Sequence, residues 1–115
     1  MSFFKKLEHY FKETITKNYA NFNGRASREE YWMFVLANFI AIIAIAIIGN
    51  TLGIKVLASL YILGIIVPSI AIGIRRMHDV NKSGWFILIP IYNLVLFCTK
   101  GDHAHNQYGD TPKAL

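Results

Sequence analysis

Hydrophobic positions along the chain form one periodic segment followed by three continuous blocks. The periodic segment covers residues 3–19, where Phe3, Leu7, Phe11 and Ile15 recur every four positions. This spacing places them on one face of a helix, with lysines and other polar side chains opposite. We therefore predict an amphipathic helix over 3–19. Beside membrane segments, such a helix is expected to lie in the bilayer interface, and the alternative is that it packs on a partner.

The first apolar block begins at a helix start signal. Asn23-Gly24 is typical of a turn, and Ser27-Arg28-Glu29-Glu30 matches a capping box. In a capping box, Ser27 accepts from the backbone three residues on, while the Glu30 side chain reaches back to the Ser27 amide. The sequence then carries no charge from Tyr31 to Ile48, which is long enough to cross a hydrocarbon core of about 30 Å. A first span is predicted over 28–49.

The second block predicts another span, over residues 55–74. No charge lies between Val56 and Ile74, but Pro68 interrupts the run. We expect a kink at this proline, tolerated because a neighbouring helix can satisfy the carbonyl that proline frees. The polar stretch that follows, residues 75–84, is predicted to be a hinge.

The third block, residues 85–99, is shorter than the first two. As a straight helix it would cover about 22 Å at 1.5 Å per residue, and Pro90 interrupts it. We expect a short third span, and the alternative is a re-entrant hairpin broken at Pro90. Residues 100–115 form a polar tail. The pattern as a whole predicts a single all-α membrane domain, residues 1–115, with an interfacial helix and about three transmembrane helices.

Composition and charge support this assignment and suggest an orientation. Hydrophobic residues make up 54% of the chain and charged residues 17%, against about one quarter charged in soluble domains. The net charge of +5 favours a basic face toward anionic lipid headgroups rather than nucleic acid. Lysines and arginines gather before the first block and in 75–84, which places both segments in the cytoplasm. The tail is outside if the third block spans and inside if it turns back.

The candidate site is the polar cluster that this topology places at the cytoplasmic face. Guanidinium groups at one level can bind phosphate in a bidentate manner, and the alternative is that they only set topology and attract lipid. Asp79 is expected to pair with one of the arginines. Aromatic residues are predicted at the interface around the cluster. The cluster comprises Arg25, Arg28, Arg75, Arg76, His78 and Asp79, and the aromatics are Tyr31, Trp32 and Trp85.

Other candidate chemistry is poorly supported by the sequence. No nucleophile accompanies the pair His78-Asp79, and His103-x-His105 lacks the further ligands that a metal site needs. Cys98 has no second cysteine to pair with and is predicted to be a small buried side chain. The apolar runs 31–48, 56–74 and 85–99 contain no acidic or basic residue, which counts against an ion-coupled carrier. We therefore predict no catalytic residue, no metal, no cofactor and no enzymatic activity.

Three motifs give the chain a family resemblance. The segment from Phe22 to Trp32, the run from Arg75 to Asp79 continuing to Trp85, and the closing motif with Asn106, Tyr108 and Gly109 occur in order. Together they resemble the bacterial domain of unknown function 805 family, the YhaH-like small inner membrane proteins. The resemblance implies a small helical inner-membrane protein without an established biochemical activity.

These observations lead to a structural and a functional hypothesis. Arg25, Arg28, Arg76 and Asp79 are expected to form one polar cluster that locks the helix ends together. The protein is expected to be a non-enzymatic module that binds a membrane protein partner or anionic lipid, and it can be a homo-oligomer. The alternative is a component of a small oligomeric channel or transporter.

Overall fold

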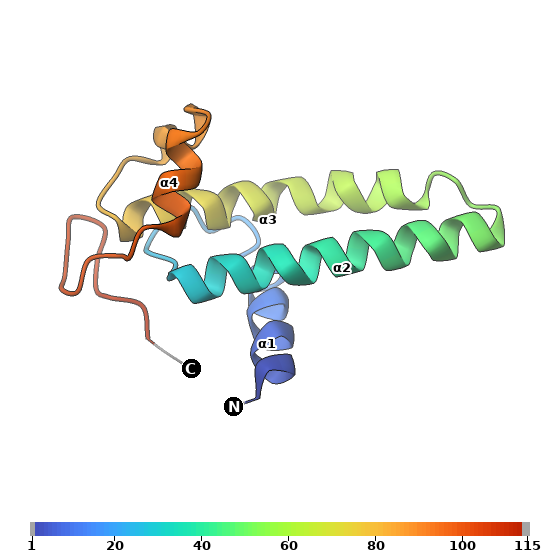
Figure 1. The fold of residues 1–115 in the computed structure, drawn as a ribbon, viewed down its shortest axis with the longest axis horizontal. Coiled ribbons are helices and arrows are strands. Elements are labelled where there is room, and N and C mark those ends of the chain that lie inside the picture. The colour runs from blue at the N-terminus through green and yellow to red at the C-terminus, as the bar shows by residue number, and fades with distance from the viewer. Residues whose placement is uncertain (1, 114–115) are drawn as a thin grey trace.

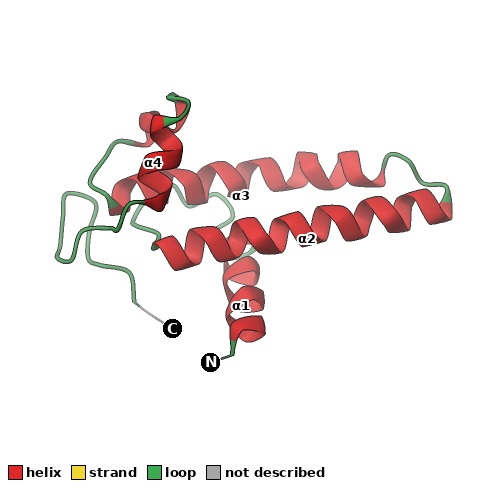
Figure 2. Ribbon diagram, in the orientation of Figure 1, coloured by secondary structure: helices red, strands yellow, loops and turns green. Residues whose placement is uncertain are grey.

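The computed structural model describes residues 2–113, which form helices joined by loops and contain no strand within that range. Two long helices form an antiparallel hairpin, and the shorter elements cross it near one end (Figure 1). Figure 2 shows how little of the hairpin is loop. In chain order the elements are α1 (Phe3–Ile15), α2 (Arg28–Leu52), α3 (Leu57–Asp79), the 3-10 helix η1 (Gly84–Leu88) and α4 (Tyr92–Cys98).

Helix α1 runs across the hairpin rather than along it (Figure 1). Tyr10 and Thr14 are buried, and the Phe11 ring stacks on Phe34 of α2 with 5.7 Å between ring centres. Half of the helix therefore packs on the chain's own hairpin, and packing on a partner stays an alternative. Phe3 and Phe4 at its free end stay 50% and 77% exposed, as an interfacial helix requires.

Helix α2 begins where the sequence predicts and is apolar on all sides. Ser27 caps it, accepting from the Glu30 amide at 3.1 Å, and Gly53 ends it with φ +75°. The second half of the predicted capping box is wrong. Glu30 Oε2 accepts instead from Arg75 Nη1 at 2.9 Å, because a charged guanidinium is a stronger donor than a neutral backbone amide.

Helix α3 extends five residues beyond the predicted span. Residues 75–79 are helical rather than part of a hinge. The stop comes later, at Asn81, whose φ of +60° allows its own amide to bond to His78 O and the Lys82 amide to bond to Met77 O. This pairing is the Schellman ending of a helix. As a result, the charged residues of this stretch sit on a rigid helical turn at fixed spacing.

Pro68 lies inside α3, which continues through it. Proline has no N–H, so the carbonyl of Gly64 one turn earlier loses its helical donor. The Tyr19 hydroxyl donates to this carbonyl at 2.7 Å. We expected a neighbouring helix to supply the donor, and the donor comes instead from the turn after α1. Helix α1 ends at Ile15, before the predicted residue 19, and the following turns bring Tyr19 to this carbonyl.

The third apolar block does not form one helix. Within residues 2–113, two helices are long and apolar enough to span a membrane, Arg28–Leu52 and Leu57–Asp79. The third block is split into η1 and the seven residues of α4, which cover about 10 Å. The third span is therefore not confirmed.

The break in this block is a tight turn at Pro90. The Tyr92 amide bonds to the Pro90 carbonyl at 2.8 Å across Ile91, whose φ is +69°. The chain reverses there, and α4 returns beside the same end of the hairpin from which η1 left (Figure 1). The re-entrant alternative requires such a reversal at Pro90, and re-entry into the membrane itself stays a prediction. Cys98, predicted to be buried, is exposed at the end of α4.

Candidate functional site

Asp79 lies at the centre of the predicted polar cluster, between two arginines. Its Oδ1 accepts from Arg25 Nε at 2.9 Å, and its Oδ2 accepts from Arg76 Nη1 at 2.8 Å. Both arginine side chains are 0% exposed and the Asp79 side chain is 5% exposed. Arg76 and Asp79 share the last turns of α3, whereas Arg25 comes from the loop before α2. The predicted pairing of Asp79 with one arginine is therefore a pairing with two.

The rest of the Arg25 guanidinium holds the C-terminal tail. Its Nη1 donates to the carbonyls of Ala104 and Gly109 at 2.8 and 3.1 Å, and its Nη2 donates to Asp102 O at 2.6 Å. The Asp102 amide in turn donates to Asp79 O at 2.8 Å. Arg25 thus joins segments 54 and about 80 positions away in sequence.

Arg76 holds the end of α4 in the same manner. Its Nε donates to Phe97 O at 3.2 Å, its Nη1 also reaches Ala26 O at 3.3 Å, and its Nη2 donates to Thr99 O. Gly101 passes so close to Asp79 that a Cβ at this position would fall on the carboxylate. The two arginines and Asp79 therefore connect the start of α2, the end of α3, the end of α4 and the tail.

The other two arginines lie outside this triad. Arg75 is buried, and its Nε and Nη1 donate to Asn21 O and Glu30 Oε2 at 3.1 and 2.9 Å. Its Nη2 has no hydrogen-bond partner in the described part of the chain. Arg28 is exposed and makes a single bond, to Cys98 O at 3.2 Å. Arg28 is therefore the member of the predicted cluster with a solvent-facing guanidinium.

His78 is placed by the closing sequence motif. Its ring stacks on Tyr108 with 3.9 Å between ring centres and 2° between planes, and its Nδ1 lies 2.9 Å from Gly24 O. Asn106 Nδ2 donates to His78 O at 3.0 Å, and Gly109 supports the turn with φ +120°. The three sequence motifs therefore meet at one end of the molecule. His78 is turned away from Asp79, since the carboxylate accepts from the two arginines.

The interface aromatics divide into two groups. Tyr31 stacks on Phe97 with 4.5 Å between ring centres, and Trp32 Nε1 donates to Phe97 O at 3.1 Å. Both therefore fasten α4 to α2. Trp85 is different, since it makes no stacking contact among residues 2–113 and is 78% exposed.

Glu29 is a site residue that the capping-box motif contains but does not explain. It accepts from Lys6 Nζ at 3.0 Å and from the Tyr10 hydroxyl at 3.1 Å, which anchors α1 to the start of α2. Burial, and then the hydrogen bond to Glu29, raises the pKa of Tyr10 above its usual range, so its hydroxyl remains a donor. In the sequence, the only sign of this role is that a second glutamate, Glu29, precedes Glu30 of the capping box.

The geometry determines what this cluster can do chemically. The guanidinium N–H groups of Arg25 and Arg76 donate to oxygens of the same chain. Neither guanidinium is therefore free to bind a phosphate in a bidentate manner. Among residues 2–113, no group of three His, Cys, Asp or Glu side chains is arranged to hold a metal ion. Arg25, Arg76 and Asp79 therefore form a buried ionic lock.

Fold and site together define a class: a small helical membrane protein in which a buried ionic cluster closes one end of an apolar two-helix hairpin. The sequence model of the family described as "Protein of unknown function (DUF805)" matches residues 19–110. The chain belongs to this family, which confirms the resemblance seen in its three motifs.

Two curated relatives come from Escherichia coli strain K12. The inner membrane protein YhaI is 43% identical over 109 residues, which cover 87% of this chain and 92% of YhaI. The inner membrane protein YhaH is 33% identical over 120 residues, which cover 93% of this chain and 98% of YhaH. No solved structure matches this chain.

Proposed function

We propose that this protein is a multi-pass inner-membrane module without enzymatic activity that binds a membrane partner, either a protein or an anionic lipid. Both named relatives are inner membrane proteins, and α2 and α3 have the length and hydropathy of spans. With the N-terminus in the cytoplasm, the ionic lock lies at the cytoplasmic face, where arginines and lysines gather.

The observation that carries the binding proposal is the exposed apolar surface of the η1–α4 segment, residues 84–98. The lock fixes this segment against the hairpin, yet five of its large apolar side chains are more than half exposed. An exposed apolar surface of this kind marks contact with a protein partner or with the membrane. These side chains are Trp85, Leu88, Ile91, Leu94 and Val95.

Of the three polar side chains that a pore could use, Asn38 and Asn93 give the channel alternative no support, whereas Ser59 is exposed on α3. Asn38 accepts from the Tyr61 hydroxyl at 2.7 Å between α2 and α3, and Asn93 donates to Ile87 O at 2.8 Å. Both side chains therefore bond within the chain, as interhelical hydrogen bonds in membranes often do, and neither is left to line a pore.

Affinity purification in native-membrane discs, followed by mass spectrometry of proteins and lipids, tests the binding proposal. The variant L94Q/V95Q makes the exposed face of α4 polar and should lose the specific partner. The matched control F3Q/F4Q makes the same change on exposed side chains of α1 and should retain it. If nothing beyond bulk lipid accompanies the unaltered chain, the binding proposal is wrong, and solute flux in vesicles becomes the next measurement.

A further inference from the structure

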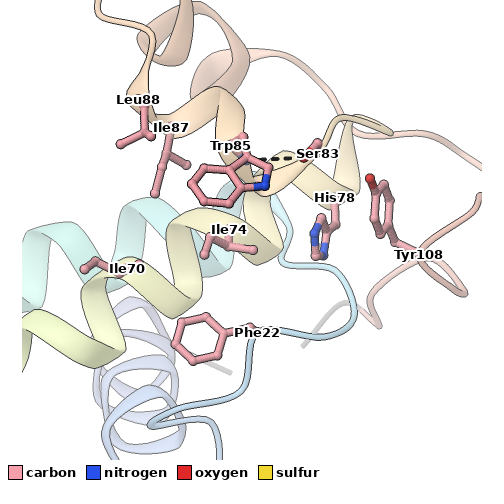
Figure 3. A pocket seen from close by; sticks show the side chains of 10 residues that line it. Phe22, Ile70, Ile74, His78, Ser83, Trp85, Ile87, Leu88 and Tyr108 are labelled. Carbon is pink, nitrogen blue, oxygen red and sulfur yellow. Dashed lines mark hydrogen bonds between the residues drawn. The ribbon is translucent and has the colours of Figure 1, made fainter.

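A groove lies along α3, between this helix and η1 (Figure 3). Its volume is about 540 Å³, within the range of small-molecule sites. Ile70, Ile74 and His78 recur every four residues and form its floor, while η1 forms one wall. From Ile70 to His78 the floor is about 12 Å long at 1.5 Å per residue. It runs parallel to the helix and therefore along the direction of lipid chains.

One end of this groove is polar and the rest is apolar. The polar end contains the stacked rings of His78 and Tyr108 together with Ser83 (Figure 3). Within residues 2–113, His78 Nε2 and the Tyr108 hydroxyl make no hydrogen bond, so both are available to a ligand. Lys82 precedes Ser83, and its Nζ lies 5.9 Å from the centre of the Phe86 ring of η1. Phe86 does not line the groove, so Lys82 neighbours the polar end through its position in the chain, directly before Ser83.

We propose that this groove binds one acyl chain of an anionic phospholipid, with the phosphate at the polar end near Lys82. This inference rests on the proposed function and names its ligand. The apolar part of the groove continues the exposed face of α3, where Ile66 and Ile70 are each 43% exposed to the space that the bilayer fills. The basic end of the molecule lies at the level of the headgroups, so a negative headgroup complements it.

Quenching of Trp85 fluorescence by brominated lipid tests the proposal directly. The substitution W32F leaves Trp85 as the sole tryptophan of the full chain. Nanodiscs of phosphatidylcholine receive dibrominated phosphatidylglycerol or, at equal mole fraction, dibrominated phosphatidylcholine. We expect phosphatidylglycerol to quench Trp85 at about fivefold lower mole fraction, the factor that corresponds to about 1 kcal/mol for one basic residue near the headgroup.

Three variants in the W32F background locate the site. I70F fills the groove and should abolish the preference for phosphatidylglycerol. I66F makes the same change one turn earlier, on an equally exposed residue outside the groove, and should keep it. K82Q removes the cation and should bring the two lipids to equal quenching. Thermal unfolding of each variant in detergent confirms that a lost preference is not lost folding.

Several outcomes would overturn the inference. Equal quenching by both lipids in the W32F chain, or equal effects of I70F and I66F, would remove the groove as an anionic lipid site. A protein partner that is retained in the purification experiment, combined with equal quenching, would leave the proposed function standing and sink the lipid site alone. Absence of any partner together with equal quenching would refute both the proposed function and the lipid site.

Discussion

Asp79 is a buried carboxylate that accepts from two buried guanidiniums. A carboxylate buried without partners would be strongly disfavoured, and so would either arginine alone. The three side chains are stable together because each charge faces an opposite charge and the remaining donors meet backbone carbonyls. Removal of one member leaves the others buried and unpaired, which costs more than the original pair contributes.

Substitution of Asp79 by alanine should therefore greatly reduce the stability of the folded protein. We expect a loss of about 3–5 kcal/mol in the free energy of unfolding, since two guanidiniums remain without a counter-charge. Arg76→Ala should cost a similar amount. Arg28→Ala is the control, because Arg28 is exposed with one hydrogen bond and its loss should cost less than about 1 kcal/mol. Thermal unfolding in detergent measures all three, and unchanged stability of both D79A and R76A would refute the lock.

Gly101→Ala tests how closely the tail packs on this carboxylate. The added methyl group would fall on Asp79, which its two arginines hold in place, so the tail must move away. We expect a loss of stability comparable to loss of a buried ion-pair member, about 3 kcal/mol. Gly64→Ala, where a Cβ meets open space within α3, should be neutral or stabilising by up to about 1 kcal/mol. Equal stability of G101A and the unaltered chain would contradict this packing.

Among the elements, α3 depends most visibly on groups outside itself. Its interior proline removes one hydrogen bond, and the Tyr19 hydroxyl replaces it from outside the helix. Its end is capped by Asn81 and by the Ala26 amide, which donates to Arg75 O at 2.9 Å. The helix is therefore completed by the loop between α1 and α2.

A double-mutant cycle can isolate the bond from Tyr19 to the Gly64 carbonyl. Tyr19→Phe should cost about 1 kcal/mol or more, since it leaves that carbonyl without a donor. In a Pro68→Ala background the restored N–H of residue 68 satisfies the carbonyl, so the same substitution should cost little. The coupling, measured by unfolding of the four proteins in detergent, should be about 1 kcal/mol. Additive effects would show that the hydroxyl does not compensate for the proline.

In the whole molecule, α1 and the η1–α4 segment cross the hairpin at the end that holds the lock (Figure 1). Because the chain reverses at Pro90, the tail comes back to the loop before α2, where Arg25 binds it. The loop between α2 and α3 lies at the far end (Figure 1). With α2 and α3 as the proposed spans, we expect residues 23 and 104 on one side of the membrane and residue 54 on the other.

Single cysteines in a C98S background test this topology. N23C and A104C should be protected from a membrane-impermeant maleimide in intact spheroplasts and should react after lysis, whereas I54C should react in both. This result follows from a cytoplasmic N-terminus with the tail on the same side. Labelling of A104C and N23C from opposite sides would contradict the fold. Labelling of both from outside, with I54C protected, would contradict only the orientation.

The sequence by itself determined the two long apolar helices and the family. Continuous apolar runs without a polar face predict membrane helices locally, and Ser27 marks the start of α2. The first span was predicted to end at residue 49, but α2 continues to Leu52. The first two motifs also predicted one polar cluster, whereas the part of the closing motif in it was missed. Such features depend on residues within one or two helical turns of each other, so they can be predicted from the sequence.

Tertiary structure alone decided how the charges pair and where the third block goes. Glu30 left its local cap for Arg75, 45 positions away, because the buried ion pair is the stronger bond. The chain turned back at Pro90 because the carbonyls after it, from Phe97 to Gly109, are the acceptors that Arg25 and Arg76 require. Acceptors on the backbone have no signature in the sequence, so no pattern of residues could have revealed these contacts.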